Sequence, residues 1–338
     1  MLNLVFLGSD PIALPLLDWL AGEGGAIARV TAVFTQPDRP VGRGQKVAAN
    51  GVKLWALDRG LPVYQPEKIT EDVRGQLAAL RPDVSLVMAY GHILRQDFID
   101  TPRLGTLNLH ASLLPKYRGA SPIQTAVASG EHETGVSLMR IVRQLDAGPV
   151  ADVERVPVES RDTALEIEHK LAAACVPLLA RTLPKVASGE LPFTEQDHPA
   201  ATFCRRLSKD DGRLDFTAPA ADLAARINGL FPWPACTVEI AGTPVKIGLA
   251  DCVEPDATSP VLNPACGAVS GMDGQGLLVA TGRGVLRCLR LQKPGGKMLP
   301  AAEFLRGFTI TTGTVLPSLA MPALVATAPF PYRKTPQG

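Results

Sequence analysis

The chain has 338 residues, of which 46% are hydrophobic and 20% charged, and its formal net charge is +1. This length is enough for two domains of ordinary size. The near-neutral charge excludes a protein that binds polyanions by bulk charge, so any nucleic-acid contact must come from a local patch.

The chain begins with an apolar run over residues 1–8 that has no basic leader, which predicts a first strand and not a signal peptide. We expect no apolar stretch of transmembrane length, no membrane contact and a cytoplasmic location. The six cysteines include no C-x-x-C pair and none at a zinc-like spacing from a histidine. We therefore expect free thiols and no metal site.

In the first half of the chain, short apolar runs alternate with helix-like segments. The strands are expected at 2–7, 30–35, 84–89, 106–110 and 135–141, and the helices at 12–20, 52–58, 70–80 and 121–128. This alternation predicts an α/β fold whose mostly parallel, doubly wound sheet has helices on both faces. A long helix over 162–186 is expected to close this first domain, which we assign to residues 1–190.

The texture of the sequence changes after a linker predicted at 191–208. Short alternating strands are expected at 237–240, 245–252, 268–270, 276–280 and 285–291, with helices at 220–230 and 301–306. A series of short strands at this spacing predicts a small β-barrel over 209–312. Residues 313–338 contain five prolines and form a Pro-rich tail that is either disordered or draped over a domain.

The most informative motif is Asn108-Leu109-His110, which is followed 36 residues after the histidine by Asp146-Ala147-Gly148. Residues two apart in a strand share a face, so an amide donor and a titratable imidazole would lie together. Such a pair can hold an oxygen that becomes negative when an amine attacks a carbonyl, and an aspartate near the imidazole would favour its protonated form.

A lone histidine on a strand is more often a core residue, and an Asp-x-Gly is often only a turn. The polar loop over 115–124, directly after the strand, favours a site, because open α/β sheets bind ligands at such loops. An NAD-dependent dehydrogenase is excluded, because Gly8 lacks the further glycines of a dinucleotide-binding turn. A non-enzymatic RNA-binding protein would have no use for the motif.

Several segments together resemble the methionyl-tRNA formyltransferase family over roughly residues 2–312. They are Gln36-Pro37-Asp38-Arg39-Pro40 with Gly42-Arg43-Gly44, Ala89-Tyr90-Gly91, 108–124, Glu133-Thr134-Gly135-Val136, 145–148, Phe231-Pro232-Trp233-Pro234 and Gly295-Gly296-Lys297-Met298.

The resemblance implies a formyltransferase-type, Rossmann-like first domain and an OB-like, tRNA-binding second domain. It also implies transfer of a formyl group from 10-formyl-tetrahydrofolate to the free amine of methionyl initiator tRNA during translation initiation. The sequence does not give the oligomeric state, and we take a monomer as the default. The alternative is a folate-dependent formyltransferase that acts on an amino sugar or a purine precursor. Such an enzyme would keep Asn108, His110 and Asp146 but would not need the 36–46 loop or this second domain.

The resemblance also suggests roles for individual residues. Asn108 and His110 would donate hydrogen bonds to the oxyanion, and Asp146 would keep the imidazole charged and relay the proton of the amine. The expected folate-binding residues are Ser112, Leu113, Leu114, Pro115, Ala89, Tyr90 and Gly91. The expected tRNA-binding residues are Arg39, Arg43 and Lys46 in a loop of net charge +2, and Arg287, Lys293 and Lys297 in a segment of net charge +5 over 24 residues.

Overall fold

The computed structural model describes residues 1–41, 44, 46–253 and 265–331. The chain divides into two compact units. Unit 1 comprises Met1–Arg118, Gly135–Val156 and Glu168–Ala201, and unit 2 comprises Gly119–Thr134, Pro157–Ile167 and the chain from Thr202 onward. The chain therefore passes between the units several times, whereas the sequence predicted one cut near residue 190, a division that stays a prediction.

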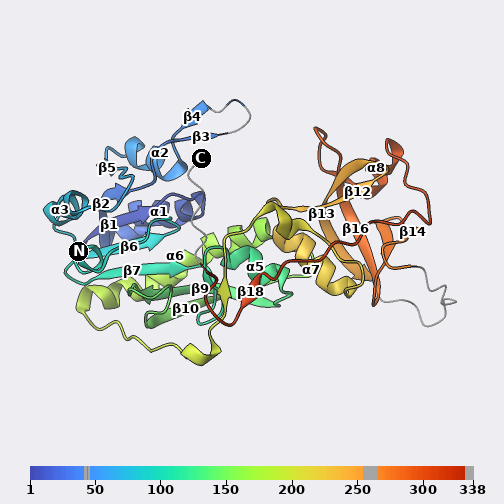
Figure 1. Cartoon of the computed structure of the whole chain (residues 1–338). Helices are drawn as coiled ribbons and strands as arrows, with labels where there is room; N and C mark the ends of the chain where they lie inside the picture. Colours follow the sequence, from blue (N-terminus) through green and yellow to red (C-terminus); the bar gives the residue numbers. More distant parts are fainter. Residues whose placement is uncertain (42–43, 45, 254–264, 332–338) are drawn as a thin grey trace. The chain divides into compact units, whose positions relative to one another are not determined.

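Unit 1 is built on a seven-stranded sheet in which β1, β6 and β7 lie side by side (Figure 1). The strand order is β10-β9-β7-β6-β1-β2-β5. Strands β5, β2, β1, β6 and β7 pair in parallel, and β9 joins β7 antiparallel. The bounds are β1 (Leu2–Gly8), β2 (Ala28–Phe34), β5 (Val63–Tyr64), β6 (Val84–Met88), β7 (Thr106–His110), β9 (Glu133–Arg140) and β10 (Val150–Pro157). A separate hairpin pairs β3 (Arg39–Val41) with β4 (Lys46–Ala48).

Helices cover both faces of this sheet. Leu77 and Phe98 pack in one buried cluster with Val5 and Val87, whereas Cys175 lies against Met88, whose side chain leaves β6 on the opposite face from Val87. The elements are η1 (Pro11–Ala13), α1 (Leu14–Ala21), η2 (Glu23–Ala26), α2 (Gly51–Asp58), α3 (Glu71–Ala79), α4 (Gln96–Ile99), α6 (Ala164–Ser188) and η3 (His198–Ala200). The predicted mostly parallel, doubly wound α/β class is therefore confirmed.

The long helix α6 corrects one expectation from the sequence. Its length and composition alone would let it cross a membrane, although we expected no stretch of that kind. Half of its most apolar window is buried in the protein, and Leu171, Cys175 and Leu179 are fully enclosed. A core helix of a folded protein and a membrane-spanning helix can have the same apolar composition, and the burial of α6 accounts for its composition as that of a core helix.

Unit 2 is built on antiparallel strands. The sheet order is β12-β13-β16-β15-β14, and β17 pairs with β16. The bounds are β12 (Cys236–Ile240), β13 (Thr243–Val253), β14 (Val269–Met272), β15 (Leu277–Ala280), β16 (Val285–Gln292) and β17 (Leu299–Pro300), with η4 (Lys209–Gly212), α5 (Pro122–Ala128), α7 (Ala220–Leu230) and α8 (Ala301–Arg306). A Cβ added at Gly229 of α7 would lie 2.2 Å from the backbone nitrogen of Ala128, so α5 and α7 can approach this closely only at a glycine.

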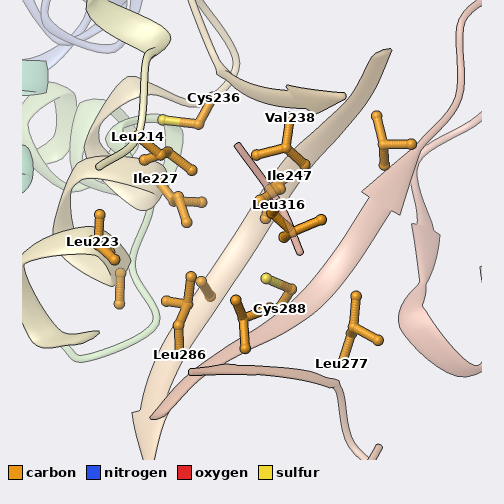
Figure 2. Close-up of a cluster of buried hydrophobic side chains, with 14 of the residues drawn as sticks. Leu214, Leu223, Ile227, Cys236, Val238, Ile247, Leu277, Leu286, Cys288 and Leu316 are labelled. Carbon is orange, nitrogen blue, oxygen red and sulfur yellow. The ribbon is translucent and has the colours of Figure 1, made fainter. Parts of the chain in front are cut away.

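One hydrophobic cluster joins α7 to the strands of unit 2, with Leu223 and Ile227 facing Val238, Ile247 and Leu286 (Figure 2).

The Pro-rich tail belongs to unit 2 as far as it is described. Leu316 and Leu324 enter the hydrophobic cluster, and β18 (Val325–Ala326) pairs with β11 (Phe203–Cys204), which also pairs with β8 (Arg118–Gly119). Of the two alternatives for the tail, residues 313–331 follow the draped one.

Candidate active site

Strand β7 carries Asn108 and His110 in the middle of the unit 1 sheet. Asn108 lies between Val87 of β6 and Met139 of β9, and His110 lies opposite Ser137 of β9. The two side chains share one face because they are two residues apart. Asn108 is half-buried and His110 is 6% exposed. The sheet thus fixes the backbone of both residues from two sides.

The imidazole of His110 is held by a backbone carbonyl. Its Nε2 lies 2.9 Å from the carbonyl oxygen of Tyr117, which can only accept, so Nε2 carries a proton and donates it. Tyr117 adopts a left-handed backbone (φ 59°) that turns its carbonyl toward the ring. The second ring nitrogen, Nδ1, is the one left to exchange a proton.

Asp146 comes from the connection between β9 and β10 and faces Nδ1. Its Oδ2 lies 3.7 Å from Nδ1 of His110, an ion-pair distance that is longer than a hydrogen bond. The next residue but one, Gly148, has a packing reason to be glycine, because an added Cβ would lie 1.9 Å from the carbonyl oxygen of Arg140. The sequence placed Asp146 near His110, and the structure brings them together.

The amide of Asn108 differs from most buried polar groups. Among the described residues, its side chain makes no hydrogen bond within the protein. Partly buried polar groups are usually satisfied by partners, so an amide without one, on the same strand face as the catalytic histidine candidate, is suited to binding a ligand.

The loop after β7 is internally bonded. The hydroxyl of Ser112 donates to the carbonyl of Lys116 at 2.7 Å, and the hydroxyl of Ser137 both donates to the Ser112 carbonyl and accepts from the Leu114 amide. Ser112 is fully buried, whereas residues 113–115 are half-buried. Of the four expected folate contacts in this loop, Ser112 uses its hydroxyl within the loop. The other three are partly exposed to solvent.

The segment Ala89–Gly91 follows the end of β6. The Ala89 carbonyl accepts from the amide of Ser9, and the Tyr90 carbonyl accepts from the side chain of Gln36 at 3.1 Å. The Tyr90 ring points into the hydrophobic core, and burial raises the pKa of its hydroxyl, which has no hydrogen-bond partner among the described residues. Any contact that Tyr90 makes with a ligand is therefore a backbone contact, whereas Ala89 and Gly91 are exposed.

Two buried residues near Asp146 were not singled out from the sequence. Arg118 donates from Nε and Nη2 to the side-chain oxygen of Gln196, and Nη2 also lies 3.1 Å from Nδ1 of His198. Burial lowers the pKa of the Arg118 guanidinium, and the carboxylate of Asp146 opposes that shift. Gln196 lies in the predicted linker, and no local pattern marks it, because its partners are about 50 and 80 residues away.

Comparisons with known proteins identify the family of this chain. Residues 2–183 match the Formyl transferase family, and residues 206–309 match the Formyl transferase, C-terminal domain family. A methionyl-tRNA formyltransferase of Ectopseudomonas mendocina (strain ymp) is 41% identical over 89% of this chain and 93% of the relative. One of Sorangium cellulosum (strain So ce56) is 41% identical over 92% of this chain and 98% of the relative. The chain belongs to the methionyl-tRNA formyltransferase family.

Solved structures support the fold of this family member. An N-formyltransferase from Helicobacter canadensis, in complex with folinic acid and dTDP-3-aminofucose, superposes with a TM-score of 0.62 at 17% identity and covers 87% of this chain and 100% of that one. HypX from Aquifex aeolicus, in complex with tetrahydrofolic acid, has a TM-score of 0.57 at 16% identity and covers 90% of this chain and 47% of that one. The expected formyltransferase-type fold is confirmed.

The loop over 36–46 carries the first set of tRNA-binding residues predicted from this family. Arg39 at the start of β3 pairs with Glu67 at 3.2 Å, and both side chains are exposed. Lys46 opens β4 and is exposed, whereas Arg43 lies outside the described residues. Asp38, the acidic residue of this loop, is paired with Lys53. Hydrogen bonds from Lys53 and Gln65 lower the pKa of the Asp38 carboxyl.

The second set of predicted tRNA-binding residues divides into two kinds. Arg287 donates to Asp251 at 2.7 Å and to Asp273 at 2.8 Å, and these hydrogen bonds raise the pKa of its guanidinium. Lys293 and Lys297 are exposed in the turn after β16. The local charge count of +5 overlooked the two aspartates, which come from elsewhere in the chain. A role for Arg287 in binding tRNA stays a prediction, and its structural role is evident.

Proposed function

We propose that this protein transfers the formyl group of 10-formyl-tetrahydrofolate to the amine of methionyl initiator tRNA, as a cytoplasmic monomer, in translation initiation. The observation that supports it most is the approach of Asp146 Oδ2 to His110 Nδ1 at 3.7 Å. The same strand carries Asn108, whose amide has no protein partner among the described residues. Family membership supplies the substrates. The geometry supplies roles for the three side chains.

In this proposal Asn108 and His110 donate hydrogen bonds that stabilise the negative charge developing on the formyl oxygen. The amine nitrogen attacks the formyl carbon, and the carbonyl electron pair moves onto oxygen. The Asn108 amide donates to that oxygen. A pre-aligned donor of this kind lowers the free-energy barrier by about 3 kcal/mol. The bond to N10 of the folate then breaks, the carbonyl re-forms, and the proton that the amine loses is relayed by Asp146 and reaches N10.

His110 handles the proton through one nitrogen only. Because Nε2 donates to the Tyr117 carbonyl, the ring accepts or donates at Nδ1, and Asp146 stabilises the imidazolium when Nδ1 is protonated. The amine that attacks is a weak base next to an ester, so it needs placement more than activation. The gap of 3.7 Å at Nδ1 closes when substrate or a water shares the proton, since catalytic hydrogen bonds are often long before substrate binds.

For the folate, the proposed contacts are the half-buried surface of residues 113–115 and the backbone of Ala89–Gly91. The Tyr90 ring and the Ser112 hydroxyl serve the fold instead, because both are enclosed. Folate affinity should thus tolerate Tyr90→Phe, since the ring of phenylalanine fills the same core position and removes only a hydroxyl that has no partner among the described residues.

For tRNA, the proposed contacts of the second domain are Lys293 and Lys297. Arg287 is left out of this set because its guanidinium is paired with Asp251 and Asp273. Each phosphate contact releases counterions, so tRNA affinity falls steeply with salt, and removing one contact lowers the slope of log affinity against log salt by about one. Lys297→Ala should show this decrease, while folate affinity and its weak salt dependence stay unchanged. Equal slopes for the wild type and Lys297→Ala would remove Lys297 from the interface.

A transfer assay separates the proposal from its alternative. The protein is mixed with 10-formyl-tetrahydrofolate and, in parallel, with methionyl initiator tRNA, uncharged initiator tRNA or an amino-sugar nucleotide. We expect formylation of the charged tRNA only. Formylation of the sugar nucleotide at a higher kcat/KM than the tRNA would replace the proposal with the sugar or purine-precursor alternative.

A further inference from the structure

Gln196 forms a buried connection between the predicted linker and the Asp146 loop. It is 8% exposed, although the residues on either side, Glu195 and Asp197, are exposed. Its side-chain nitrogen donates to the carbonyl oxygens of Asp146 at 2.9 Å and Gly148 at 2.7 Å. A glutamine in a connecting segment thus contacts the backbone on both sides of Ala147.

The orientation of this amide is fixed by its partners. The side-chain oxygen of Gln196 accepts from Nε of Arg118 at 3.1 Å and from Nη2 at 2.7 Å. An arginine only donates and a carbonyl only accepts, so the oxygen must face Arg118 and the nitrogen must face Asp146 and Gly148. Both donors and both acceptor positions of the amide are used, which leaves it one arrangement.

The segment around Gln196 is itself anchored. Thr194 and Val150 exchange backbone hydrogen bonds of 2.9 and 2.8 Å at the start of β10. The guanidinium of Arg140, the last residue of β9, lies 4.4 Å from the centre of the Phe193 ring. The residues that precede Gln196 are therefore fixed to both strands that flank the Asp146 connection, and Gln196 spans from there to the loop.

The Asp146 loop has features that require such support. Asp146 has a left-handed backbone (φ 46°), which costs a non-glycine residue about 1–2 kcal/mol. The neighbouring Leu145 is 57% exposed and contributes little to packing. A conformation of this kind persists only when surrounding contacts determine it. The two hydrogen bonds from Gln196 are such contacts, placed on the carbonyls of Asp146 itself and of Gly148.

We propose that Gln196, oriented by Arg118, is a positioning residue that sets the distance of the Asp146 carboxylate from Nδ1 of His110. This inference rests on the proposed function of Asp146 in formyl transfer. It assigns a catalytic consequence to a residue outside the reacting groups. A merely structural Gln196 would affect the amount of folded protein and leave the turnover of each folded molecule unchanged.

The variants Gln196→Ala and Gln196→Glu test this proposal. Gln196→Glu keeps an acceptor for Arg118 but replaces the two donors with an oxygen that repels the carbonyls of Asp146 and Gly148. We expect both variants to lower kcat about 10- to 100-fold, because a displacement near 1 Å at a reacting group costs up to about 100-fold. The KM values for folate and tRNA should change by less than about 3-fold. Glu195→Ala is the matched control, because its exposed side chain leaves the same segment, and it should retain wild-type kinetics.

Two further measurements distinguish positioning from stability. In the background of Asp146→Asn, the change Gln196→Ala should lower kcat by less than about 3-fold, since residues that act as one unit are not additive. Hydrogen exchange of a peptide covering residues 143–150 should be faster in Gln196→Ala than in the wild type and unchanged in Glu195→Ala.

The outcomes separate this inference from the proposed function. A wild-type protein that formylates charged tRNA, with Gln196→Ala and Gln196→Glu at wild-type kcat, overturns the positioning role alone. Full additivity of Gln196→Ala and Asp146→Asn also overturns it. If the wild type does not formylate tRNA, the proposed function fails, and the exchange of residues 143–150 still tests whether Gln196 orders the loop.

Discussion

Replacing Asn108 with alanine should separate an effect on catalysis from an effect on stability. The Asn108 amide makes no protein hydrogen bond among the described residues, so its removal leaves no protein partner there unsatisfied. The side chain is half-buried and its backbone is held by both neighbouring strands, β6 and β9. The free energy of unfolding should change by less than about 1 kcal/mol, as for substitutions that break no buried contact.

The effect on turnover should be much larger. If the Asn108 amide donates to the oxyanion, its loss should lower kcat by about 100- to 1,000-fold, or about 3–4 kcal/mol of barrier. This hydrogen bond would strengthen as charge develops in the transition state, so KM for either substrate should remain close to that of the wild type. Asn108→Asp should be at least as slow, because a carboxylate in the same place offers no donor and opposes negative charge on the formyl oxygen.

The assay measures kcat and both KM values with 10-formyl-tetrahydrofolate and charged initiator tRNA. Chemical unfolding and equilibrium folate binding are measured on the same preparations. Retention of kcat within about 3-fold in Asn108→Ala, with normal folate binding, would refute the oxyanion role. A loss of kcat that tracks a loss of folded protein would assign Asn108 to the fold instead.

Asn228 provides the matched control. It is also an asparagine, but it is 3% exposed and its side chain exchanges two hydrogen bonds of 2.9 Å with the backbone of Ala250. Asn228→Ala leaves a buried N–H and a buried carbonyl without their partner, and each such group costs about 1–3 kcal/mol. We therefore expect the opposite pattern, with lower stability and wild-type kcat per folded molecule.

Three other predictions concern groups fixed by the fold. Burial would raise the pKa of the Asp211 carboxyl, but hydrogen bonds from Arg205 (2.6 and 2.8 Å) and Ser208 lower this pKa overall. The ionised carboxylate therefore contributes its full stabilisation of the fold above the usual pKa of 3.8. This contribution is lost as the pH falls through the lower pKa of the folded state. Asp211→Asn should thus destabilise unit 2 by about 3 kcal/mol at pH 7 in urea unfolding, and a difference that grew toward pH 2 would contradict this sign. Gly148→Ala should lower both kcat and the melting temperature, because the new Cβ meets the Arg140 carbonyl at 1.9 Å; normal kinetics would show that the loop adapts. Burial raises the pKa of the Cys175 thiol to about 12, so iodoacetamide at pH 8 should modify Cys175 only after unfolding, as read by mass spectrometry, and rapid modification of the native protein would show that α6 opens.

Some parts of the fold were predictable because their signals are local. Strand β7 and helices α7 and α8 have the bounds expected from the sequence, since each is an uninterrupted run with one period of apolar residues. Strand β10 was missed because it lacks such a run. Most of its residues are half-exposed, and charges interrupt its apolar positions. Helix α4 has only four residues, too few to show a period.

The candidate site divides in the same way. The motif over 108–110 and the Asp146-Ala147-Gly148 signature were visible in the sequence, because the proposed chemistry would require particular residue types there. The roles of Arg118 and Gln196 were not predicted. Arginine and glutamine are common surface residues, so neither the place of Arg118 in the 115–124 loop nor that of Gln196 in the predicted linker indicated burial. Their burial follows from contacts across about 80 residues of chain. The same holds for Arg287. The sequence predicted it as a cation for tRNA, and the fold pairs it with Asp251 and Asp273.

The sequence by itself determined which chemical groups are present and which local segments carry them, because hydrophobic period and residue type depend on near neighbours. The tertiary structure alone decided which nitrogen of His110 is held by a backbone carbonyl, that Arg287 is paired with aspartates, and what holds the Asp146 loop. Those outcomes depend on distances between residues that are remote along the chain. Hydrogen bonds and ion pairs change strength within about an ångström, and only the folded backbone fixes distances to that precision.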